Sequence, residues 1–180
     1  ATRMAMDRLN DKTVLVRKQA MQLLTALLEN NPFMGNLDPK PYRDKLSELY
    51  KQVIDNLPGA IKEAKEQAVA EEVEDASEET ALEVEQATLA AVMNEVDGWT
   101  EQEMSEEQQQ YKIKVNALKF TQSALEFIDI FEDATTNLEG MILSANVSDV
   151  TEALRFFVQA RHFQLPCAVT GIKRSLALMW

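Results

Sequence analysis

Apolar residues recur at the spacing of an α-helix along most of this chain, and this pattern restricts its fold more than any other feature. In residues 14–30 six aliphatic side chains fall on one helical stripe: Val16, Ala20, Leu23, Leu24, Leu27 and Leu28. A second stripe with the same spacing comprises Tyr42, Leu46, Leu49, Tyr50, Val53, Ile54 and Leu57. No segment has the two-residue alternation of a strand, and five glycines and five prolines are too few for a turn-rich β-sandwich. The sequence therefore predicts an all-α chain.

Further helices are predicted over 60–75, from residue 82 to 97, and from Tyr111 to Phe131, with Ser105 as the N-cap candidate ahead of the last of these. Others are predicted over 134–144, after Ser148 as N-cap, and from residue 167 to the end. The helix over 111–131 has two apolar stripes, one with Val115, Leu118, Leu125 and Ile128 and the other with Ile113, Phe120 and Phe127. Such a helix is expected to lie between two neighbours. Pro39 and Pro41 are predicted to lie in an extended loop. Paired helices joined by short turns favour stacked helical hairpins, that is, an α-solenoid.

Charge is distributed unevenly along the chain. The formal net charge is -12, yet residues 63–107 hold 16 acidic residues and one lysine, so the remainder is mildly basic. We therefore predict helical hairpins over 1–62, an acidic helical insert or linker over 63–107, and further hairpins over 108–180. The apolar runs are too short to cross a membrane.

Few residues are suited to catalysis or metal binding. The chain has one histidine, His162, and one cysteine, Cys167, and no nucleophile, phosphate-loop or metal motif occurs. Cys167 opens a predicted helix, where a thiolate could be stabilised, but no base accompanies it. The acidic run from Glu71 to Glu79 lacks the ligand spacing of a calcium loop. The sequence predicts a protein that is not an enzyme and that needs no cofactor or metal.

Two segments go beyond generic helix pattern. Residues 10–33 carry an Asp and then a Val-Arg pair ahead of a helix that ends in Asn-Asn-Pro-Phe, and residues 148–180 begin Ser-Asp-Val-Thr-Glu-Ala and end in a Gly-Ile-Lys-Arg helix. The first segment is similar to the turn and second helix of a HEAT repeat. The resemblance implies that Asp11 ties the inter-helix turn and that Arg17 reaches a neighbouring unit. Both segments, in this order, resemble the HEAT-repeat, non-SMC subunits of condensin, which are far longer, so we expect this chain to be a fragment.

The resemblance implies a non-catalytic scaffold in an α-solenoid of HEAT-type hairpins. Such subunits bind the kleisin subunit of condensin, contact the SMC ATPase heads and support DNA engagement in mitotic chromosome condensation. The implied location is the nucleus and the chromosome, with a cytoplasmic phase in part of the cell cycle. The alternative is another HEAT-repeat carrier, such as a nuclear transport receptor.

Basic residues recur on several of the predicted helices. In a solenoid, residues of successive hairpins align along one edge, and phosphate binding needs no base-reading motif. The candidate contacts to DNA or to a partner are Arg17, Lys18, Lys112, Lys114, Lys119, Arg155, Arg161, Lys173 and Arg174. The alternative is that Arg17 and Arg155 tie neighbouring repeats and that the other side chains are only solvated.

Overall fold

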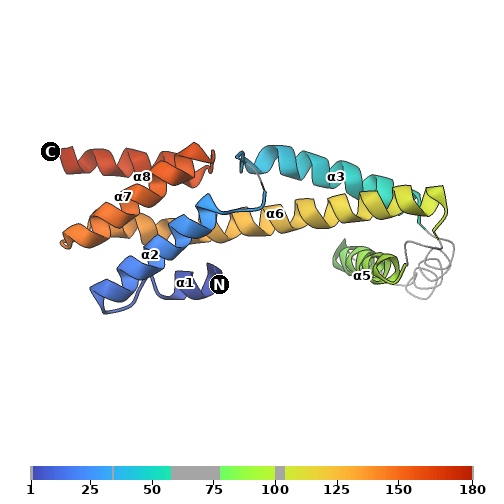
Figure 1. Cartoon of the computed structure of the whole chain (residues 1–180), viewed down its shortest axis with the longest axis horizontal. Helices are drawn as coiled ribbons and strands as arrows, with labels where there is room; N and C mark the ends of the chain where they lie inside the picture. Colours follow the sequence, from blue (N-terminus) through green and yellow to red (C-terminus); the bar gives the residue numbers. More distant parts are fainter. Residues whose placement is uncertain (1, 34, 58–77, 100–103, 180) are drawn as a thin grey trace. The chain divides into compact units, whose positions relative to one another are not determined.

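The computed structural model describes residues 2–33, 35–57, 78–99 and 104–179 (Figure 1). These residues form α-helices and one 3-10 turn, with no strand among them, which confirms the all-α prediction. The helices are α1 (Thr2–Asp7), α2 (Val14–Glu29), α3 (Pro39–Asp55), α5 (Glu78–Asp97), α6 (Glu106–Ile142), α7 (Val147–His162) and α8 (Cys167–Ser175), followed by η1 (Leu176–Met179). None of the described helices is long and apolar enough to span a membrane.

The chain divides into two compact units. Unit 1 comprises Ala1–Arg43 and Gln122–Trp180, and unit 2 comprises Asp44–Thr121. Unit 2 is thus inserted in the sequence between the two parts of unit 1. The division over 1–62, 63–107 and 108–180 stays a prediction.

A row of aromatic rings runs through the core of unit 1. Phe33 lies 5.3 Å from Phe127, Phe127 lies 4.8 Å from Phe131, and Phe131 stacks on Phe156 at 5.9 Å between ring centroids. Phe156 meets the ring of Phe157 edge-on at 5.5 Å. Such pairs contribute roughly 0.5–1.5 kcal/mol each beyond the area they bury. The rings therefore connect the loop after α2 with α6 and α7.

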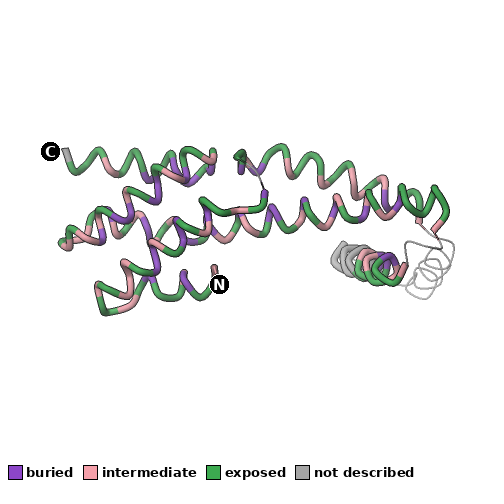
Figure 2. Tube along the Cα trace, in the orientation of Figure 1, coloured by how far each residue is buried: buried purple, intermediate pink, exposed green. Residues whose placement is uncertain are grey.

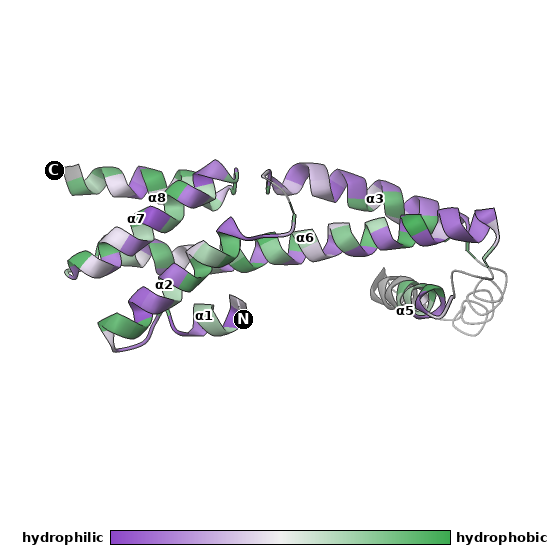
Figure 3. Ribbon diagram, viewed as in Figure 1, coloured by the Kyte–Doolittle hydropathy of each residue, from purple (hydrophilic) through white to green (hydrophobic). Residues whose placement is uncertain are grey.

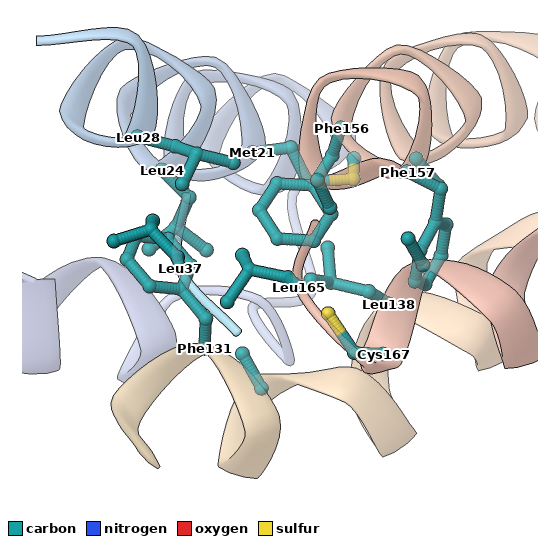
Figure 4. Close-up of a cluster of buried hydrophobic side chains, with 14 of the residues drawn as sticks. Met21, Leu24, Leu28, Leu37, Phe131, Leu138, Phe156, Phe157, Leu165 and Cys167 are labelled. Atoms are coloured by element: carbon teal, nitrogen blue, oxygen red, sulfur yellow. The ribbon is translucent and has the colours of Figure 1, made fainter. Parts of the chain in front are cut away.

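Aliphatic side chains fill the space around these rings (Figure 4). Met21, Leu24 and Leu28 of α2 are fully buried, as is Leu37 of the loop that follows. The backbone N–H of Leu37 donates to the carbonyl of Phe163 at the end of α7, at 2.8 Å. This bond holds the loop after α2 on the α7 helix terminus.

In unit 1, α2 runs parallel to α7, and the second half of α6 runs parallel to α8. On α2 and α7, Arg17 pairs with Asp149 and Gln22 with Glu152, so both helices advance in the same direction. On α6 and α8, Glu132 accepts from the backbone N–H of Cys167, and Glu139 lies 3.8 Å from Arg174. These two contacts also follow one another in the same order along both helices. Antiparallel hairpins whose corresponding helices stack in parallel are typical of a solenoid, not of an up-and-down bundle.

Unit 2 has a smaller core, made mainly of valine. Val53 of α3 packs with Val92 and Val96 of α5 and with Val115 and Leu118 of α6, all fully buried. Tyr111 of α6 joins them, and its hydroxyl donates to the carbonyl of Val53 at 3.2 Å. Helix α3 thus has one face on this core, while most of its other residues are exposed (Figure 2).

Helix α2 confirms its predicted bounds within a residue, but one side chain of its stripe is misplaced. Leu24 and Leu28 are buried as predicted, whereas Leu23 is exposed and Met21 takes its place in the core. The stripe of six aliphatic residues is wider than the buried face, so the period alone did not separate Leu23 from its neighbours. Asp11 accepts from the backbone N–H of Thr13 just before the helix begins.

The prediction of an extended loop at Pro39 and Pro41 is wrong. Both residues lie in the first turn of α3, where a missing N–H costs nothing because the first four N–H groups of a helix have no partner inside it. Asp38 precedes the helix and accepts from the backbone N–H of Lys40 at 3.0 Å. The prolines therefore start this helix.

Residues predicted as two helices, 111–131 and 134–144, form the single helix α6 of 37 residues. No proline lies between the two predicted segments, so nothing interrupts the hydrogen-bond ladder. The helix begins as predicted at Ser105, whose hydroxyl accepts from the backbone N–H of Gln108 while the Gln108 side chain accepts from that of Ser105. Of the two predicted apolar stripes, that of Val115 is buried, whereas Ile113 and Phe120 are exposed.

Helix α7 begins with Asn146 as its N-cap, not with Ser148 as predicted. The Asn146 side chain accepts from the backbone N–H of Ser148, which lies inside the first turn. At the other end, Gln164 has φ 62°, and the N–H of Leu165 donates to the carbonyl of Ala160 at 2.9 Å. This is a Schellman turn in which Gln occupies a position that favours glycine.

The predicted helix over 60–75 and the acidic run Glu71–Glu79 lie wholly or mainly outside the described residues.

Candidate functional site

The sequence candidates are basic side chains, and the structure sorts them by what they contact. Arg17 lies at the start of α2 and faces inward. Its Nη1 donates to the carbonyls of Asp11 and Lys12 at 2.8 and 3.1 Å. Its Nε and Nη2 donate to the Asp149 carboxylate on α7 at 3.3 and 2.6 Å. Arg17 therefore ties its own turn and the neighbouring hairpin, the role that the HEAT resemblance implies.

Asp149 is fully buried, and it is held both from α2 and from the loop that precedes its own helix. Besides Arg17, the hydroxyl of Ser144 donates to its Oδ2 at 3.0 Å. The hydrogen bond that the Arg17 guanidinium donates to Asp149 raises the pKa of Arg17 above its ordinary value. The pair is thus a fixed structural link, with the carboxylate out of reach of solvent.

A second carboxylate, Glu152, lies one turn further along the same contact between α2 and α7. It is also buried and accepts from the side-chain amide of Gln22 at 2.8 Å. Arg155 lies 3.4 Å from its Oε2 and Lys18 lies 3.9 Å from its Oε1. The structure thereby brings two of the candidates, Lys18 and Arg155, together around one buried acid.

The candidates on the first half of α6 lie in unit 2, where two of them cap α5. Lys119 donates to both carboxylate oxygens of Asp97 at 2.7 and 2.8 Å and to the carbonyl of Met93 at 3.4 Å. Lys112 donates to the carbonyl of Trp99 at 3.0 Å. Cations near the C-terminus of a helix satisfy its last carbonyls and complement its dipole. Lys112 and Lys119 therefore have a structural role at the end of α5.

Lys114 borders an open groove of about 1390 Å³ within unit 2. The groove lies between the ends of α3 and α5 and the start of α6, and its lining includes Trp99, Glu95 and Glu106. Acidic residues outnumber the single lysine in this lining. The groove does not favour an anionic ligand.

The remaining candidates lie near helix C-termini in unit 1. Arg161 is in the last turn of α7, and Lys173 and Arg174 are in the last turn of α8, where cations are electrostatically favoured. All three are exposed, and Arg174 lies 3.8 Å from Glu139. Among the described residues Arg161 and Lys173 form no ion pair. Together with Lys114, these two side chains are the candidates that form the fewest contacts with other polar groups among the described residues.

The thiol of Cys167 opens α8 as predicted, but its surroundings oppose a thiolate. The side chain is buried in the unit 1 core, and burial, together with the nearby Glu132 carboxylate, raises its pKa to about 12. A thiol with this pKa is protonated at neutral pH and is a poor nucleophile. His162 lies exposed at the end of α7, against the ring of Phe163. Within the described residues, no cluster of His, Cys, Asp and Glu could hold a metal ion.

Sequence reasoning missed the two carboxylates that organise the basic residues. Asp149 and Glu152 lie three residues apart on α7, so they share a face, and that face is buried with Ala153 and Phe156. The sequence feature that could have identified them is the complementarity of two helices: one carries two acids, and the other carries Arg17, Lys18 and Gln22. Nothing in the linear sequence states that α2 and α7 are neighbours.

Comparison with known proteins covers almost the whole chain. No protein-family model matches it. Condensin complex subunit 1 of Saccharomyces cerevisiae is 25% identical over 194 residues, which cover 99% of this chain and 16% of the relative. The subunit of the same name from Schizosaccharomyces pombe is 28% identical over 96% of the chain and 15% of the relative. Condensin-1 complex subunit CAP-D2 of Arabidopsis thaliana is 25% identical over 95% of the chain and 13% of the relative.

The chain spans less than a fifth of the length of these curated relatives. The aligned part nevertheless includes both segments on which the resemblance rests and the residues between them. The predicted resemblance is therefore confirmed: over nearly all of its residues this chain is similar to condensin complex subunit 1, with helices stacked as in a HEAT-type solenoid.

Proposed function

We propose that this chain is part of the non-catalytic solenoid of a condensin subunit and that it acts as a scaffold for the kleisin subunit and the SMC ATPase heads. The observation that carries the proposal is the parallel stacking of α2 on α7 through Arg17 and Asp149, in a chain similar to condensin subunits over nearly its whole length. Stacked hairpins present long surfaces suited to protein partners. The corresponding location is the nucleus and the chromosome, with a cytoplasmic phase.

Co-purification tests the scaffold role. The tagged chain is mixed separately with the kleisin and with each SMC head domain, and retention is measured by gel and by light scattering. We expect retention of at least one condensin subunit. A Leu24→Asp chain, whose core is disrupted, should retain none and controls for non-specific adsorption. Failure to retain any condensin subunit by the well-folded chain contradicts the proposal.

The alternative of a nuclear transport receptor is not favoured, because the three relatives are condensin subunits. A transport receptor binds a small GTPase of the nuclear transport system, so that protein serves as the negative control in the same co-purification.

We further propose that DNA engagement, where this chain takes part in it, uses the exposed cations Arg161, Lys173 and Arg174. Lys112, Lys119 and Arg17 already bind carbonyls or carboxylates of the chain itself. A mobility shift on duplex DNA at two salt concentrations compares the parent with a Lys173→Glu, Arg174→Glu double variant. Binding that weakens with the double variant and with rising salt supports phosphate contact. Equal binding by both proteins contradicts it.

A further inference from the structure

The contact between α2 and α7 exposes two cations at its surface edge. The Lys18 side chain keeps 38% of its surface exposed and that of Arg155 keeps 59%, whereas Glu152 between them keeps only 7%. One carboxylate faces two cations, so the site carries a net positive charge. No other ion pair involves Lys18 or Arg155 in the described part of the chain.

Glu152 positions these cations without saturating them. Its short bond goes to Gln22 at 2.8 Å, while Arg155 and Lys18 stay at 3.4 and 3.9 Å. A guanidinium has five N–H donors and an ammonium three. Most of the donors of both side chains therefore remain available to a partner on the solvent side.

Exposed aliphatic side chains flank the cations on both helices. Leu15 of α2 is 64% exposed, and Val158 of α7 is 63% exposed. Leu15 and Lys18 are three residues apart, and so are Arg155 and Val158, so each pair shares one side of its helix. Figure 3 shows hydrophobic and hydrophilic residues interspersed along both α2 and α7. Leu15, Lys18, Arg155 and Val158 together are called the α2–α7 face.

We propose that the α2–α7 face docks an acidic protein segment that also carries apolar side chains. Carboxylates of such a segment pair with Lys18 and Arg155, and its apolar side chains cover the flanking Leu15 and Val158. A DNA backbone offers the charge but no apolar groups, so it gains little from these flanks. The proposal rests on the scaffold function and deepens it, because it names the class of partner for one surface of unit 1.

Fluorescence anisotropy on the full chain tests the proposal with three labelled 16-residue peptides and one duplex. The peptides are four repeats of Glu-Leu-Glu-Ser, of Glu-Ser-Glu-Ser and of Lys-Leu-Lys-Ser, and the duplex has 16 base pairs. We expect the Glu-Leu peptide to bind about tenfold more tightly than the Glu-Ser peptide, and the basic peptide not to bind. The first comparison measures the apolar flanks and the second the charge.

Substitutions then locate the site. Arg155→Glu and Val158→Ser should each weaken the Glu-Leu peptide about fivefold or more. Lys51→Glu makes a charge reversal at an exposed residue of α3 in unit 2 and should leave peptide binding within about twofold. Val158→Ser should leave duplex binding unchanged. Circular dichroism confirms that each variant is as helical as the parent.

Three results overturn the proposal: preference for the duplex over the Glu-Leu peptide, peptide binding that Arg155→Glu and Val158→Ser do not weaken, or self-association of the chain that these two substitutions abolish. The last would assign the face to a second copy of the chain. Retention of a condensin subunit together with any of these results leaves the scaffold function standing, so the two proposals fail independently.

Discussion

Unit 1 and unit 2 each have a buried apolar core, but the two cores contain different residue types. The core of unit 1 contains a row of phenylalanines and the long aliphatic side chains of Met21, Leu24 and Leu28. The core of unit 2 contains valines and Tyr111, held by the lysines that cap α5. Phenylalanine and leucine bury more apolar area per residue than valine, so unit 1 gains more from burial.

The ion pairs of the two units differ in burial. In unit 1 Arg17 pairs with the fully buried Asp149, whereas in unit 2 Lys119 pairs with the exposed Asp97. Exposed pairs contribute little, while a buried pair is costly to break. The contact of α2 with α7 lies within unit 1, although unit 2 is inserted into the sequence between these two helices. We expect unit 2 to open at a lower free energy than unit 1.

Two probes report on the units separately. Cys167, the chain's one cysteine, is buried in unit 1, so its reaction with Ellman's reagent reports the opening of that unit. Trp99 lies 6.1 Å from Tyr111 in unit 2, and its fluorescence reports there once Trp180 is replaced by Phe.

The largest effect is expected for Leu24→Asp, which places a charge at a fully buried position of unit 1. An unpaired buried charge should lower the free energy of unfolding by several kcal/mol, roughly the whole stability of a domain. Thermal unfolding by circular dichroism measures the loss, and Cys167 should become reactive. The matched control is Leu23→Asp on the neighbouring exposed residue, with an expected change of about 0.5 kcal/mol or less. Equal losses in the two variants would show that the assignment of the α2 face is wrong.

This pair of leucines also shows what the sequence can predict. The helices, the cap at Ser105 and the buried stripe through Leu24 follow from the local sequence, because regular spacing places residues on one face of a helix. The exposure of Leu23 depends on which neighbours arrive from distant segments, whereas the N-cap at Asn146 and the continuity of α6 have local causes that the spacing of apolar residues does not show. The candidate site shows the same limit. Nine cations were identifiable from the sequence, but which of them pair with Asp149 and Glu152 becomes clear only when α2 and α7 lie side by side.

The second effect compares the two ion pairs. Arg17→Ala leaves Asp149 buried with Ser144 as its donor, so the melting temperature should fall by about 5 °C or more. Lys119→Ala removes a pair whose acid is exposed, so it should shift the transition by about 2 °C or less. Differential scanning calorimetry measures both. If Lys119→Ala proves as destabilising as Arg17→Ala, the contrast between the units does not hold.

A third, smaller effect concerns the approach of α8 to α7. A Cβ added to Gly171 would lie 2.2 Å from the ring of Phe157, which is buried and has no room to turn freely. Gly171→Ala should therefore cost about 1–3 kcal/mol in urea unfolding. Gly140→Ala, on the exposed side of α6 with no atom near the new Cβ, should instead stabilise by up to about 1 kcal/mol. A stabilising Gly171→Ala would mean that α8 does not pack closely on Phe157.

The smallest effect at neutral pH is the loss of stability in alkali, which distinguishes the two units by one buried ionisable group in each. Burial raises the pKa of the Cys167 thiol from 9.0 to about 12 in unit 1, and burial with the nearby Glu95 raises that of the Tyr111 hydroxyl from 10.0 to about 12 in unit 2. In both cases the folded state keeps a proton that the unfolded state releases, so stability falls as pH rises above the unfolded pKa. We expect no change in the free energy of unfolding between pH 7 and 8.5, a loss in unit 1 from about pH 9, and a loss in unit 2 from about pH 10.

Urea unfolding at stepped pH, followed by circular dichroism for the chain and by Trp99 fluorescence for unit 2, measures the two onsets. Cys167→Ala should remove the earlier onset and Tyr111→Phe the later one, because neither replacement ionises. An alkaline loss that persists in the Cys167→Ala, Tyr111→Phe double variant would contradict its assignment to these two buried groups.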